Sequence, residues 1–124
     1  MKLKFLLLAL LVILLFFACK EIDHSMLHGK WKGHQTLIHD KVVDKGAELI
    51  TFEFEPSGVF RFELAHRKQA GHFRTVEDKL FTKDTLNPEM EEIVVRVILL
   101  TTDSLHLQMN RSGTDEILKC FREK

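Results

Sequence analysis

Two of the seven histidines in this chain of 124 residues, His24 and His28, have a spacing that suits metal binding. Residues four apart share one face of a helix, so the two imidazoles could bind zinc together, with Asp23 beside them. No Glu follows His24, so the His-Glu-x-x-His pattern of zinc hydrolases is missing. The alternative is a pair of solvated histidines on a tether. We adopt it and predict no metal and no cofactor.

Three carboxylates, Glu53, Glu55 and Glu63, are the candidates for acid–base chemistry. Paired carboxylates can act as acid and base when one of them is desolvated. These residues alternate with phenylalanines, which predicts that they face water and keep ordinary acidity. The sequence has no nucleophile elbow, phosphate loop or Cys-x-x-Cys motif. We therefore predict no catalytic residue and a protein that is not an enzyme.

The chain has only two cysteines, and the first, Cys19, follows an apolar leader. Lys2 and Lys4 precede fourteen apolar residues, 5–18, a length typical of a signal peptide (~7–15) and short of the ~20 that span a bilayer. Ala18 directly before Cys19 resembles the lipobox of bacterial lipoproteins, with Phe16 where that family usually has Leu. The resemblance implies a cleaved signal peptide, 1–18, and a diacylglyceryl group on Cys19.

This resemblance also implies a location: the bacterial outer membrane, with the protein lipid-anchored in the cell envelope and facing either the periplasm or the cell surface. The stretch 20–23 resembles the Lys-plus-acid signals that direct some Bacteroidetes lipoproteins to the surface. With Cys19 acylated, Cys120 has no partner for an intramolecular disulfide. We predict that Cys120 is a small buried residue.

After a tether, 19–28, short strand-like runs continue through 29–124, which we predict to be one domain. In the run 49–55, Ile50, Phe52 and Phe54 alternate with polar residues, and a Pro-Ser-Gly turn at 56–58 joins it to a similar run. The segment 40–46 is expected to be a polar connection, and 85–91 is the longest break. The pattern predicts an all-β fold of about eight antiparallel strands in an up-and-down meander closed as a small β-barrel: 31–39, 49–55, 60–64, 71–76, 79–83, 93–101, 105–110 and 116–122.

The segment Leu27-His-Gly29-Lys-Trp31 resembles the opening Gly-x-Trp of lipocalin-like domains. Segments 50–60, 71–76 and 97–107 are similar to later hairpins of the short lipocalin-like lipoproteins common in Bacteroidetes. The resemblance covers 27–122 and implies that Trp31 packs beneath Arg122 and, with Gly29, closes the barrel. A guanidinium over an indole face is a favourable arrangement. The chain is shorter than full lipocalins and lacks their disulfide.

An eight-stranded barrel can be filled by its own side chains or can hold one small ligand. We expect apolar side chains from most strands to point inward: Leu37, Ile50, Phe52, Phe54, Phe60, Phe62, Leu64, Phe73, Leu105, Leu107 and Phe121. A packed core is one interpretation. The other is a small apolar pocket at the end opposite Trp31, lined by Phe54, Phe60, Phe62 and Phe73, which would bind a fatty acid or another apolar molecule.

The run 93–100 is apolar on both faces of its strand, so one face must point outward. It is either ordinary surface, a surface covered by 22–28, or a contact with a protein partner or a second copy of the chain.

Equal numbers of basic and acidic residues, eighteen each, argue against a nucleic-acid partner. The leading hypothesis is a lipid-anchored, non-enzymatic envelope protein that binds a small apolar ligand or a protein partner. The alternatives are an envelope enzyme inhibitor or immunity-type lipoprotein, and a structural accessory lipoprotein of a larger complex.

Overall fold

The computed structural model describes residues 4, 21–44 and 46–124, so the predicted signal peptide and Cys19 lie outside the described residues. A one-turn helix, α2 (His24–Leu27), precedes a sheet of nine strands and a 3₁₀ turn, η1 (Ala47–Leu49). Within the described part of the chain, no helix is long and apolar enough to cross a membrane. The strands are β1 (Gly29–Ile38), β2 (Lys41–Val43), β3 (Ile50–Phe54), β4 (Val59–Leu64), β5 (Arg67–Val76), β6 (Lys79–Asp84), β7 (Ile93–Leu100), β8 (Ser104–Arg111) and β9 (Thr114–Arg122).

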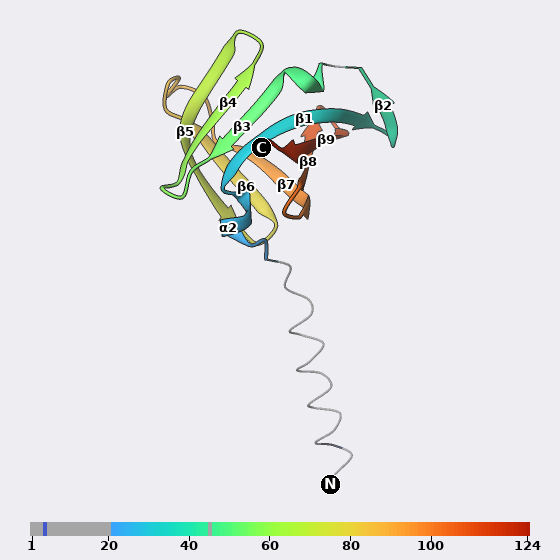
Figure 1. Ribbon diagram of the computed structural model, residues 1–124, viewed down its shortest axis with the longest axis horizontal. Helices are drawn as coiled ribbons and strands as arrows, with labels where there is room; N and C mark the ends of the chain where they lie inside the picture. Colours follow the sequence, from blue (N-terminus) through green and yellow to red (C-terminus); the bar gives the residue numbers. More distant parts are fainter. Residues whose placement is uncertain (1–3, 5–20, 45) are drawn as a thin grey trace.

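The sheet closes on itself, which confirms the predicted all-β up-and-down barrel (Figure 1). The strand order is β2-β1-β3-β4-β5-β6-β7-β8-β9, every pair described is antiparallel, and β1 also pairs with β9. β1 pairs with β3 on one side and with β9 on the other. It can do so because it is long and because its register against β9 shifts between Gly33 and Gln35. A bulge of this kind bends a strand, as closure of a small barrel requires.

The expectation of a polar connection over 40–46 is wrong, because β2 lies within it and forms a ninth strand outside the closed ring. His39 and Asp40 both have positive φ, 51° and 61°, which is the backbone of a tight two-residue hairpin turn. The turn pairs Lys41 with Ile38. The strand that was predicted over 49–55 begins one residue later, at Ile50, because Leu49 belongs to η1.

The core lies inside the barrel and follows the alternation of the strands. Among the expected inward residues, Phe54, Phe60, Phe73, Leu105 and Leu107 are buried, and Ile50, Phe52 and Phe62 are partly buried against them. Leu64 is also partly buried. Leu37 was expected to point inward, and that expectation is wrong: its neighbour Thr36 is buried and pairs with Leu118 of the core, so Leu37 faces outward.

Phe121 was expected to point inward, and that expectation is wrong: its side chain is 49% exposed and its ring centroid lies 4.7 Å from that of His34. Consecutive residues of a strand face opposite sides of a sheet. Leu118 and Cys120 of β9 face the core, so Phe121 must face outward. The prediction that Cys120 is a buried free thiol is confirmed.

Gly71 lies at a close approach of two strands in the wall. A Cβ atom at this position would lie 1.8 Å from the carbonyl oxygen of Lys83, a distance at which the backbone must move. Glycine inside a strand often serves such a contact. The position therefore fixes how β5 and β6 bend around the core.

Candidate functional site

One end of the barrel, which we call the closed end, is sealed by α2. The indole Nε1 of Trp31 donates to the carbonyl of Leu27 at 2.8 Å, and both side chains are fully buried. Arg122 lies over the indole, with its Cζ 4.2 Å from the ring centroid. Its Nη1 and Nη2 donate to the carbonyls of His28 and Met26, each at 2.6 Å. The guanidinium therefore fastens the last turn before β1 to the end of β9.

Gly29 lies beside the same guanidinium. It has a φ of 124°, and a Cβ atom there would lie 2.5 Å from Nη1 of Arg122. The structure thus brings Gly29, Trp31 and Arg122 together at the closed end. They contact each other and the backbone of residues 26–28.

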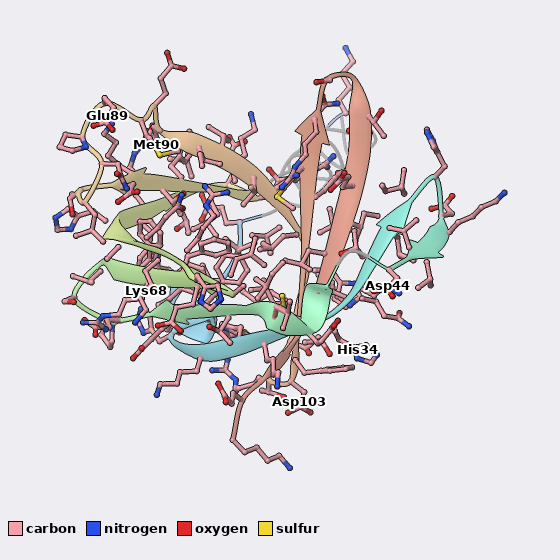
Figure 2. All side chains as sticks on the ribbon, turned by 90° about the horizontal axis from the view of Figure 1, so that it is seen from above. His34, Asp44, Lys68, Glu89, Met90 and Asp103 are labelled. Atoms are coloured by element: carbon pink, nitrogen blue, oxygen red, sulfur yellow. The ribbon has the colours of Figure 1, made fainter. Side chains whose placement is uncertain are left out.

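The opposite end, which we call the open end, contains a cavity of about 220 Å³. The lining of this mouth cavity includes Leu64 and Arg67, which flank the β4–β5 turn. Figure 1 shows this turn at the end of the barrel away from α2. Figure 2 looks from above and places Met90 beside Glu89 on the loop between β6 and β7. The cavity is lined mostly by apolar side chains from six strands and this loop: Phe52, Phe54, Phe60, Phe62, Leu64, Arg67, Gln69, Leu80, Thr82, Met90, Ile93, Val95, Leu107, Met109 and Arg111.

Phenylalanine rings form one wall of the mouth cavity. The centroids of Phe52 and Phe62 are 5.1 Å apart, and those of Phe52 and Phe54 are 6.0 Å apart with nearly parallel planes. Of the four residues proposed from the sequence, Phe54, Phe60 and Phe62 line the cavity. Phe73 does not: it packs edge-on behind Phe54 at 5.0 Å and faces the closed end.

The polar part of the lining is small and includes two arginines near the turns of the open end. Arg67 begins β5, and Arg111 ends β8. Arg111 Nε lies 3.8 Å from a carboxylate oxygen of Glu116, whose side chain is buried. The sequence does not point to these arginines, to Gln69 or to Thr82, because no local pattern links residues from three hairpins.

The loop over the mouth cavity is held in place by residues at the end of β6. Asp84 accepts hydrogen bonds from the backbone N–H of Leu86 and from Nδ2 of Asn87, both at 2.9 Å. Burial opposes ionisation of this carboxylate, but the hydrogen bonds outweigh it and lower the pKa of Asp84. Lys83 Nζ donates to the carbonyls of Pro88 and Met90. Met90 is therefore positioned at the rim by its neighbours.

The histidines of α2 are packed against the barrel, which differs from the solvated tether that we expected. His24 stacks on Phe73 at 5.1 Å, and its Nδ1 lies 3.1 Å from Oγ1 of Thr75. The His28 ring meets that of His24 edge-on at 5.2 Å. No group of three His, Cys, Asp or Glu side chains within the described residues could hold a metal ion.

The three candidate carboxylates lie along β3 and β4, on the outer face of the barrel. Arg61 forms ion pairs with both Glu55 and Glu53. The hydrogen bond from Arg61 lowers the pKa of Glu55, which keeps this carboxylate ionised. A general acid needs the opposite shift, so this arrangement favours a solvated charged face over an acid–base pair.

The outer face of β7 is apolar and partly covered. Val95 and Val97 face the core, while Val94, Ile98 and Leu99 are 40–49% exposed. Residues 21–26 run beside the end of β7 and leave a groove of about 430 Å³ between them.

Comparison with known proteins finds similarity at the level of the fold. Neither a family model nor a curated protein matches the chain. A lipocalin-like protein from Bacteroides uniformis is similar in structure, with a TM-score of 0.56 and 18% identity over 80% of this chain and 99% of that one. An uncharacterized protein from Bacteroides eggerthii gives a TM-score of 0.55 and 17% identity over 75% and 98%. The chain thus has the fold of a lipocalin-like β-barrel.

Proposed function

We propose that this chain is a lipid-anchored, non-enzymatic protein of the bacterial cell envelope that binds one small, mostly apolar ligand in the mouth cavity. The observation that carries the proposal is the cavity itself: a lipocalin-like barrel is sealed at one end by Trp31 and open at the other above a wall of phenylalanines. Concave apolar sites with few polar groups are the usual form of ligand sites, and barrel mouths are favoured positions for them.

The size and lining of the mouth cavity define the ligand. At about 220 Å³ the cavity is smaller than the ~300–1,000 Å³ of pockets that hold drug-sized molecules. A bound molecule is therefore small, or it leaves one part outside the mouth. Its inner part is apolar, because it faces Phe54, Phe60 and Phe62. Its outer part meets Arg67 and Arg111, which favour a polar or anionic group.

The envelope location rests on the sequence. The apolar leader and Ala18-Cys19 support export and acylation. The barrel is compatible with this arrangement because its chain enters at the closed end, so an anchor there leaves the mouth cavity unobstructed.

A cavity-filling variant tests ligand binding. Thr82→Phe would place a ring inside the mouth cavity, which Thr82 lines. Thr102→Phe is the matched control, because it adds the same ring at an exposed position near the closed end. Binding of an apolar naphthalene probe is followed by its fluorescence, together with the unfolding midpoint of each variant.

We expect the wild-type protein and Thr102→Phe to bind one probe with equal affinity, and Thr82→Phe to lose at least tenfold in affinity while remaining folded. Equal binding by all three proteins would place the probe on the surface and contradict the proposal. If Thr82→Phe does not fold, Met109→Phe fills the same space from β8 and replaces it.

A further inference from the structure

The segment that precedes the barrel is attached at the closed end, and this attachment defines an orientation of the barrel. At the closed end, the backbone N–H of Ile22 donates to the carbonyl of Glu77 at 3.1 Å, and Ile22 packs against the core. Asp23 caps α2 by accepting from the backbone N–H of Ser25 at 3.0 Å. The chain is therefore fixed to the barrel from Ile22 onward.

Very little chain separates this attachment from Cys19. Three residue steps connect Cys19 to Ile22, and a fully extended chain covers at most ~3.6 Å per residue, which is about 11 Å. An acyl group on Cys19 must insert into the bilayer. The closed end is therefore held within about 11 Å of the membrane surface, with no long linker that would let the barrel turn over.

The outer surface near this attachment carries apolar side chains that suit the headgroup region. The groove between residues 21–26 and β7 includes Ile22, Met26, Ile98 and Leu99. Ile98 and Leu99 are 42% and 40% exposed. Exposed apolar patches mark contacts with proteins or membranes, and the tether length favours the membrane here.

Charged groups limit how deeply this end enters. Glu21 and Asp23 lie in the same groove, and Asp78 forms an ion pair with Arg96 at 2.7 Å. The pKa values of Asp23 and Asp78 are lowered by hydrogen bonds from Ser25 and Arg96, so both carboxylates stay ionised. Ionised groups are costly to bury in hydrocarbon. The closed end therefore rests on the surface.

The mouth cavity lies at the far end of the barrel. β5 runs from Arg67 beside the cavity to Val76 near the closed end. Nine steps at ~3.3 Å, tilted by ~35–45° to the axis, give a height of about 23 Å. In Figure 1, α2 lies at the bottom and the β4–β5 turn at the top.

We propose that the acylated protein stands on its own membrane with the closed end down, with Met26, Ile98 and Leu99 at the lipid headgroups and the rim of the mouth cavity at Arg67 about 20 Å farther out. This orientation rests on the proposed anchor at Cys19 and adds to the proposed function. The ligand enters from the aqueous compartment, or from a partner on that side, and is not drawn directly from the bilayer that holds the anchor.

Labels at the two ends test the orientation. Asp103→Cys places a thiol beside the closed end, and His66→Cys places one in the β4–β5 turn at the open end; both positions are exposed. Burial raises the pKa of the Cys120 thiol to about 12, so it does not compete for the label. Full-length acylated protein with an environment-sensitive fluorophore is bound to phosphatidylcholine–phosphatidylethanolamine vesicles that carry a nitroxide on the headgroup.

We expect quenching at Asp103→Cys to exceed that at His66→Cys several-fold, and neither label to be quenched after Cys19→Ser. Equal quenching at both positions, or stronger quenching at His66→Cys, would overturn the orientation. Mass analysis of the same protein reports acylation, and binding of the naphthalene probe reports the cavity. If the protein is acylated and binds the naphthalene probe while the two labels are quenched equally, the orientation is wrong and the proposed function stands. A Cys19 without an acyl group would overturn the anchor and the orientation together.

Discussion

Removing the guanidinium at the closed end should destabilise the whole domain. In Arg122→Ala the carbonyls of Met26, His28 and Thr102 each lose a charge-assisted hydrogen bond of 2.6 Å, and Trp31 loses the cation above its ring. A hydrogen bond to a charged group contributes ~1.5–3 kcal/mol and a cation–π contact ~0.5–2 kcal/mol. Because the bond to Thr102 is exposed, we count only the two part-buried bonds and the cation–π contact. The lower end of each range then gives a loss of about 3.5 kcal/mol.

Urea unfolding followed by Trp31 fluorescence measures this loss. With an m value of about 2 kcal/mol/M, a loss of about 3.5 kcal/mol corresponds to a midpoint shift of about 1.8 M. A domain with ~5–15 kcal/mol of stability remains folded after such a change. The fluorescence of Trp31 in the folded variant should also shift to longer wavelength, because the indole is fully buried in the native protein.

Arg74→Ala is the matched control. Its Cζ also lies over an aromatic ring, 4.0 Å from the centroid of Phe81, and it pairs with Glu92 at 3.1 Å. It bonds to no backbone carbonyl within the described residues, and it is exposed. We expect a loss below about 1 kcal/mol. If Arg122→Ala and Arg74→Ala shift the midpoint equally, Arg122 does not close the barrel in the way described.

Three further predictions follow from buried positions. Gly71→Ala should lower stability by more than about 2 kcal/mol in urea unfolding, while Gly113→Ala should cost about 1 kcal/mol. A Cβ atom at Gly71 would lie 1.8 Å from the carbonyl oxygen of Lys83, whereas one at Gly113 would meet no atom within 4 Å. Cys120 should resist an aromatic disulfide reagent in the native protein and react at once in urea. Its pKa is raised on folding, so its contribution to stability is complete below pH ~8.5 and is lost as pH rises toward 12. The pKa of Asp84 is lowered on folding, so its contribution to stability is present above pH ~4 and is lost as pH falls. In Asp84→Asn, the free energy of unfolding should therefore fall less than in wild type as the pH is lowered below ~4.

The barrel was predictable because the sequence patterns that specify each hairpin lie close together in the chain. Phe52 and Phe54 alternate with polar residues, a Pro-Ser-Gly turn follows, and Phe60 and Phe62 alternate again, so each hairpin is specified within about ten residues. β2 was missed because its turn residues, His39 and Asp40, adopt positive φ without a glycine to signal it.

The mouth cavity was predictable only in part, because it depends on register between distant strands. Phe54, Phe60 and Phe62 come from one hairpin, and all three line the cavity. Phe73 follows the same alternation, but it lies nearer the closed end of β5 than the cavity does. Arg67 and Arg111 are 44 positions apart in the sequence and meet the cavity from two turns.

Native mass spectrometry of the protein purified from its own membrane tests the central claim most directly. We expect the mature chain from Cys19 to carry an acyl modification and one non-covalent small molecule, and the Thr82→Phe variant to carry the acyl group alone. An empty wild-type barrel, or the same bound molecule on wild type and Thr82→Phe, would contradict ligand binding in the mouth cavity.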